Sequence, residues 1–131
     1  LKGLDVSGAA RVEVDALQTD ELAVRLGGAA DIDIDDLDAG SLQVRLPGAG
    51  SINVDGKADN QEVRVSGAGS YSARKLECQS AVVKITGVGR AIVSAVEELD
   101  ISVTGFGSVE YYGSPRVRQS VTGLGNVISK G

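Results

Sequence analysis

The chain has 131 residues, a formal net charge of −5, and no His, Trp or Met. Without His it lacks the commonest general base and transition-metal ligand, which argues against Ser-His or Cys-His catalysis and gives no reason to expect a cofactor. The acidic balance and the four aromatic residues argue against nucleic acid as a partner. The run of 18 apolar residues that a membrane span needs is also missing.

A glycine-containing element recurs seven times at steps of 18 to 20 residues. Between these elements apolar residues alternate with polar ones, as at Val12 and Val14 or at Leu22, Val24 and Leu26. A period of two with many β-branched residues predicts strands and excludes helices. Each repeat therefore indicates a strand, a corner, a second strand and a glycine turn. The first glycines of the elements, for which we predict a structural role, are Gly8, Gly28, Gly48, Gly67, Gly87, Gly105 and Gly123.

The repeat is compatible with antiparallel hairpins or with a parallel β-solenoid of six to seven coils, and similarity between equivalent positions favours the solenoid. Tyr71 replaces a smaller apolar residue while Ala73, two positions later, is small, which keeps the volume of the layer constant. In a second column the side chains become larger along the chain, and we expect them to fill a tapering core. Its members are Ala9, Ala29, Ala49, Ala68, Val88, Phe106 and Leu124.

The turn glycines have two physical explanations, a positive φ or a backbone approach too close for a Cβ atom. Ala10 and Ala30 stand where later coils have the second glycine, which favours close approach at that position. Cys78 is the only Cys and forms no intrachain disulfide; we expect a small buried hydrophobe rather than a reactive thiol.

The repeated Ser/Thr-Gly-x-Gly element, followed by an alternating strand and by the ending Val109-Glu110-Tyr111-Tyr112-Gly113-Ser114-Pro115, resembles the bacterial putative auto-transporter adhesin family, or head GIN domain. The resemblance covers essentially the whole chain. It implies a right-handed parallel β-helix, a secreted or envelope-associated parent protein and a role in adhesion. Since the chain begins at Leu1 rather than Met, we expect residues 1–131 to be one solenoid domain cropped from a longer protein.

Two charged features are candidate sites. Arg25, Arg45, Arg64 and Lys84 occupy one outward position in four successive coils. They form either a solvated ladder paired with residues such as Glu62 and Glu21, or an anion-binding face for an acidic polysaccharide, lipid headgroups or a partner chain.

Asp31, Asp33 and Asp35 are similar to part of a calcium-binding β-roll motif. That motif repeats every nine residues, whereas this run occurs once, so a solvated acidic face is favoured and no metal site is predicted.

The segment 55–62 has Lys57 and Gln61 in place of apolar residues, and this predicts a solvated corner that bulges outward.

The charge is distributed unevenly along the chain, with a net charge of −7 in residues 1–60 and +2 in residues 61–131. Head-to-tail self-association is therefore conceivable.

The function favoured by these features and by the resemblance is a non-enzymatic envelope or surface module. It would act in adhesion or assembly, with self-association, another envelope protein or a glycan as the interaction. One alternative is a β-helix lyase or glycosidase that uses paired carboxylates, Asp33 with Asp35 or Asp35 with Asp55. The other is a lipid- or glycan-binding module.

Overall fold

The computed structural model describes residues 2–73, 75–113 and 115–129, so Ser114 of the Tyr-rich ending lies outside the described residues. Within those ranges all regular structure is β-strand, and every strand pair is parallel. The strands are β1 (Lys2–Val6), β2 (Ala9–Val14), β3 (Leu17–Leu26), β4 (Ala29–Leu46), β5 (Ser51–Val65), β6 (Ser70–Ser72), β7 (Leu76–Gly87), β8 (Arg90–Gly105), β9 (Ser108–Tyr112), β10 (Arg116–Gly123) and β11 (Asn126–Ser129).

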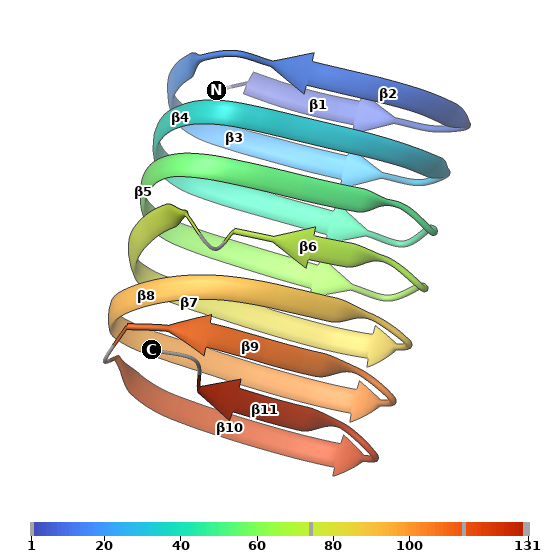
Figure 1. The fold of residues 1–131 in the computed structure, drawn as a ribbon, viewed down its shortest axis with the longest axis vertical. Helices are drawn as coiled ribbons and strands as arrows, with labels where there is room; N and C mark the ends of the chain where they lie inside the picture. The colour runs from blue at the N-terminus through green and yellow to red at the C-terminus, as the bar shows by residue number, and fades with distance from the viewer. Residues whose placement is uncertain (1, 74, 114, 130–131) are drawn as a thin grey trace.

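The chain winds as a β-solenoid of about six turns. In Figure 1 the nearer strands run from right to left and the farther strands from left to right while the chain descends, which makes the winding right-handed. The sequence repeat matches the strand register, since Ala9 pairs with Ala29 and Val83 pairs with Ile101. The predicted β-helix is thus confirmed, and the hairpin alternative is excluded.

Each coil has two corners. At the first corner, the seven predicted glycines follow one another from coil to coil, and the strands are interrupted. At the second corner, β4, β5 and β8 continue through the bend as single long strands, so the backbone hydrogen bonding between coils extends around it.

The core is a set of inward columns that run along the solenoid. One column contains Ile32, Ile52, Tyr71, Ala91 and Val109, which pair in this order and are all fully buried. Ala73 is also fully buried, two residues after Tyr71. The exchange of large and small residues that the sequence suggested is therefore present inside the solenoid.

One predicted core column is wrong. Val88, Phe106 and Leu124 are 59%, 62% and 74% exposed, so they point outward from the glycine corner. The second glycine, which is present in the last five elements, faces the core instead. A Cβ atom on Gly89 would lie 2.5 Å from Cγ1 of Val65 in the preceding coil. Because side chains alternate along an extended backbone, the residue before that glycine must point to solvent.

The expectation for residues 55–62 holds only in part. Asp59 and Asn60 are exposed as expected, but the segment belongs to strand β5 instead of a loop that bulges outward, and Gln61 is only 2% exposed. Its column contains Leu42 in the coil before and Ala81 in the coil after. Gln61 is accommodated in this apolar column because both of its amide atoms have hydrogen-bond partners, Tyr71 and Cys78. Lys57, by contrast, is exposed as expected.

Candidate functional site

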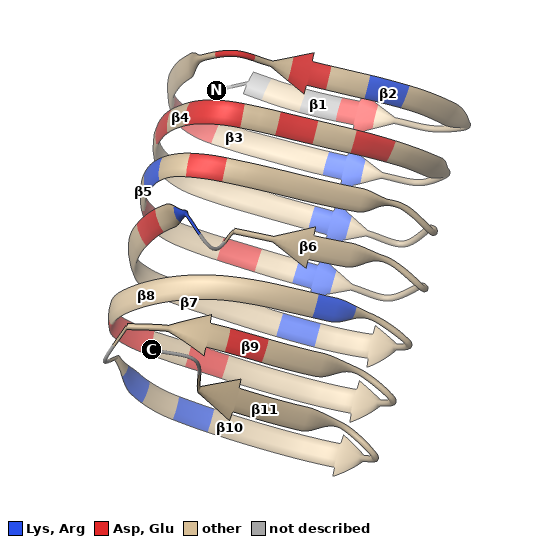
Figure 2. Cartoon of the chain, in the orientation of Figure 1, with Lys and Arg blue, Asp and Glu red and all other residues tan. Residues whose placement is uncertain are grey.

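Four basic residues form a continuous ladder across neighbouring coils. Arg25 pairs in register with Arg45, Arg45 with Arg64, and Arg64 with Lys84, on strands β3, β4, β5 and β7. All four are exposed, because they alternate with buried residues such as Val44 and Leu46. Figure 2 shows them as a blue stripe that crosses successive strands of one face. We call these four residues the basic ladder.

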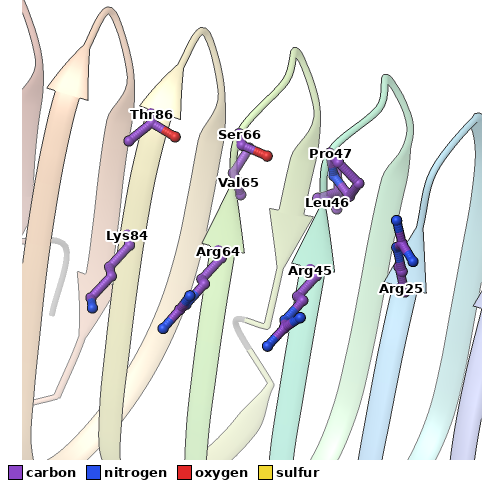
Figure 3. A pocket seen from close by; sticks show the side chains of 9 residues that line it. All are labelled: Arg25, Arg45, Leu46, Pro47, Arg64, Val65, Ser66, Lys84 and Thr86. Carbon is purple, nitrogen blue, oxygen red and sulfur yellow. The ribbon is translucent and has the colours of Figure 1, made fainter.

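The basic ladder lines a groove of about 500 Å³. Pro47, Ser66 and Thr86 form its wall on the side of the glycine corner, and the buried residues Leu46 and Val65 contribute to its floor. In Figure 3 the side chains of Arg45, Arg64 and Lys84 extend side by side in the same direction. The groove thus combines a row of cations with neutral hydroxyl groups.

The sequence interpretation missed the groove wall. Pro47, Ser66 and Thr86 each lie two residues after a member of the basic ladder. In a strand, residues separated by two share a face, so this spacing was the signal that could have identified them. They form a surface beside the basic ladder, on the side of the glycine corner.

Counter-charges compensate only part of the basic ladder. Nε of Arg64 lies 3.0 Å from Oε1 of Glu62. Within the described part of the chain, Arg25, Arg45 and Lys84 form no ion pair, and the expected pairing with Glu21 is not seen. Like charges held on neighbouring strands repel each other, so the free protein retains an electrostatic cost that an anion would offset.

The ladder has defined ends. Asp5 pairs with Arg25 before its first member, and Ser102 pairs with Lys84 after its last. Ser120 follows Ser102 in the next coil. The same outward column therefore begins with a carboxylate, continues with four cations and ends with two neutral hydroxyl groups.

The acidic run of β4 lies on the other long side of the coil from the basic ladder (Figure 2). Ser51 Oγ donates to Asp31 Oδ1 at 2.7 Å, and Asn53 Nδ2 donates to Asp33 Oδ1 at 2.9 Å, both from the next coil. In the described ranges, His, Cys, Asp and Glu side chains form no group of three or more that could hold a metal ion. Asp31 and Asp33 thus serve to join one coil to the next.

A buried polar chain links four strands of the solenoid, β5, β6, β7 and β8. Tyr71 donates to Gln61, Gln61 Nε2 donates to Cys78 Sγ at 2.9 Å, and Cys78 Sγ donates to the carbonyl oxygen of Ser94 at 2.9 Å. Burial raises the pKa of the Tyr71 hydroxyl strongly. Burial also raises the pKa of the Cys78 thiol from 9.0 to about 11, although the hydrogen bond from Gln61 opposes the change. Both groups therefore remain protonated near neutral pH.

Residues 1–115 of the chain match a known family model, which is described as putative auto-transporter adhesin, head GIN domain. The chain belongs to this family. The family description suggests a location at the cell surface or envelope and hints at a binding role. No curated protein matches the chain.

Solved structures of three proteins described as putative adhesins are similar to this structure. The protein from Bacteroides fragilis is 28% identical, with a TM-score of 0.92 over 99% of this chain and 61% of that one. The proteins from Parabacteroides merdae and Parabacteroides distasonis are 23% and 25% identical, with TM-scores of 0.85 and 0.86. They are matched over 100% and 99% of this chain and 57% of their own length.

This chain therefore spans about three-fifths of the length of the solved proteins it resembles. As for membranes, the described residues include no helix whose length and apolar character would let it cross a bilayer.

Proposed function

We propose that this chain is a non-enzymatic adhesion module of the cell envelope or surface, and that it binds its partner through the basic ladder. The observation that carries the proposal is the in-register alignment of Arg25, Arg45, Arg64 and Lys84 along a groove. A chain with a net charge of −5 has nevertheless gathered four cations into one column. An anionic partner is the simplest physical use for that arrangement.

The non-enzymatic part of the proposal is supported by how the acidic residues are used. Asp33, a member of one candidate catalytic pair, accepts a hydrogen bond from Asn53 in the next coil. Asp31 likewise accepts a hydrogen bond from Ser51 in the next coil, so the acidic residues of β4 connect neighbouring coils.

The experiment compares two double variants that remove the same amount of charge. Arg45→Ser/Arg64→Ser cuts the basic ladder, and Lys57→Ser/Lys75→Ser removes two exposed lysines near the second corner of the coil. Each protein is immobilised on beads and tested for binding to intact bacterial cells and to a glycan array. We expect the ladder variant to lose binding and the lysine variant to retain it. Equal binding by both variants, or no binding by the parent, would overturn the proposal.

A further inference from the structure

We infer that the ligand of the basic ladder is a linear acidic polysaccharide that lies parallel to the solenoid axis, with one anionic group on each sugar ring. This inference rests on the proposed function and specifies the partner of the same groove. The spacing, the width and the two ends of the basic ladder each favour this ligand.

The spacing matches a polymer better than a single ion. Adjacent parallel strands are about 4.8 Å apart, so the ladder places four cations over about 14 Å along the axis. A single phosphate or carboxylate can reach only neighbouring members of such a row. A glycan chain advances by about one strand spacing for each pyranose ring. Successive rings of such a polymer are rotated about its axis, so the long side chains of Arg25, Arg45, Arg64 and Lys84 would reach carboxylates on either edge of the chain. Each added contact would raise the affinity.

The width of the ladder favours a chain over a membrane surface. The positive charge is only one residue wide. On one side lie Pro47, Ser66 and Thr86, and on the other lies a column that contains Gln43 and Glu62. An anionic bilayer is attracted by an area of basic charge, not by a line of charge on an acidic protein. A narrow polymer fits the line, and the hydroxyl groups of Ser66 and Thr86 are placed to bond sugar hydroxyls.

The two ends of the ladder predict where the polymer continues. Asp5 stands beside Arg25 in the same column and would repel an anionic chain that passed beyond it. Ser102 and Ser120 extend the column beyond Lys84 with neutral hydroxyl groups. A chain longer than the ladder should therefore overhang on the Ser102 side.

The guanidinium groups of Arg25, Arg45 and Arg64 suit carboxylates because each can donate two parallel hydrogen bonds.

The test is calorimetric titration of the protein with oligogalacturonates of one, two, four and six rings. We expect affinity to increase up to four rings and then to level off, and to fall as NaCl is raised from about 50 to 300 mM. Arg45→Ser/Arg64→Ser should weaken tetramer binding by about tenfold or more, whereas Lys57→Ser/Lys75→Ser should not. Serine is a suitable replacement because it occupies this column at Ser102 and Ser120. Circular dichroism of each variant checks that the solenoid is intact.

Three results would overturn the inference. The first is equally tight binding of inorganic phosphate or of monomeric galacturonate, which would indicate a site for a single anion. The second is binding of phosphatidylglycerol vesicles without binding of oligogalacturonate. The third is equal affinity of Arg45→Ser/Arg64→Ser and Lys57→Ser/Lys75→Ser for the four-ring oligogalacturonate. If cells still bind through the ladder while oligogalacturonate does not, the adhesion proposal stands and only the polysaccharide assignment fails.

A single substitution tests the placement of the polymer. Asp5→Asn removes the carboxylate at the end of the column without changing the four cations. We expect it to strengthen binding of the six-ring oligomer severalfold, because the chain could then extend in both directions. Unchanged affinity for that oligomer would contradict its alignment along the column.

Discussion

The hydroxyl group of Tyr71 donates a hydrogen bond of 2.8 Å to Oε1 of Gln61 inside the solenoid, where both residues are buried. The bond explains how a glutamine can occupy a column that has Leu42 in the preceding coil. It also makes Tyr71, Gln61 and Cys78 energetically dependent on one another.

Tyr71→Phe should destabilise the protein by about 1–3 kcal/mol, because Oε1 of Gln61 would remain buried without its donor. Gln61→Leu should be destabilising alone for the same reason, since it removes the acceptor of Tyr71. The double variant should cost less than the sum of the two single variants. Urea unfolding of all four proteins measures this coupling. Strict additivity would show that the hydrogen bond contributes nothing to stability.

Stability should decrease at high pH through Cys78. Its folded-state pKa of about 11 lies above its ordinary value of 9.0, so its contribution is fully present below pH 9 and is lost as pH rises toward 11. The loss should reach about 2 kcal/mol. Cys78→Ala should flatten this part of the stability profile, measured by urea unfolding between pH 8 and 11. Parallel profiles for the parent and the variant would contradict the assignment.

Gly67→Val should destabilise the glycine corner by about 3 kcal/mol, because a Cβ atom at Gly67 would lie 2.5 Å from the carbonyl oxygen of Pro47. Gly87 has a φ of 124°, a backbone conformation that residues with a side chain rarely adopt, so Gly87→Val should be destabilising as well. Ala68→Val is the matched control, since Ala68 is exposed and the next coil has Val88 in the equivalent position. Thermal unfolding checks the difference, and equal midpoints for the Gly67 and Ala68 variants would count against this packing.

Phe106→Ser should change the unfolding free energy by less than about 0.5 kcal/mol, because Phe106 is 62% exposed. Ile101→Ala, at a fully buried position in β8, should cost about 2–5 kcal/mol. Chemical denaturation of the two variants shows whether Phe106 lies in an outward column or in a tapering core. A large decrease in the unfolding free energy of Phe106→Ser would indicate that Phe106 lies in the core.

Arg45→Gln should stabilise the protein by about 0.5 kcal/mol at low ionic strength, because it relieves repulsion from Arg25 and Arg64. The gain should disappear in about 1 M NaCl, where the screening length is only about 3 Å. Arg11→Gln is the control. Arg11 lies 3.2 Å from Glu13 and belongs to no row of like charges, so its replacement relieves no charge repulsion. A salt-independent effect at Arg45 would argue against charge repulsion.

The strand register was predictable because a solenoid repeats its backbone with every coil. Residues separated by one sequence repeat must then lie on neighbouring strands, as Arg45 and Arg64 do. The buried polar chain was not predictable in this way. Tyr71, Gln61 and Cys78 occupy different columns, and their meeting depends on the directions in which large side chains cross the core.

The orientation of residues at the glycine corner was ambiguous for a different reason. Side chains along a strand alternate between inward and outward, and this alternation normally shows which of them face the core. The turn interrupts the alternation. Val88 and Gly89 could each have faced the core in a sequence-based interpretation. The decision depends on Val65 of the preceding coil, which leaves no room for a side chain at Gly89.

Strand pairing in the described residues joins each coil only to its immediate neighbours. The length of the basic ladder is therefore a count of coils, and a gene can change it by duplicating or deleting one repeat. A tandem copy of residues 29–48 would add one arginine to the row and move its two ends apart by about 4.8 Å. Such a change would alter the number of anionic groups that the proposed polysaccharide can place along the row, while the chemistry of each contact stays the same.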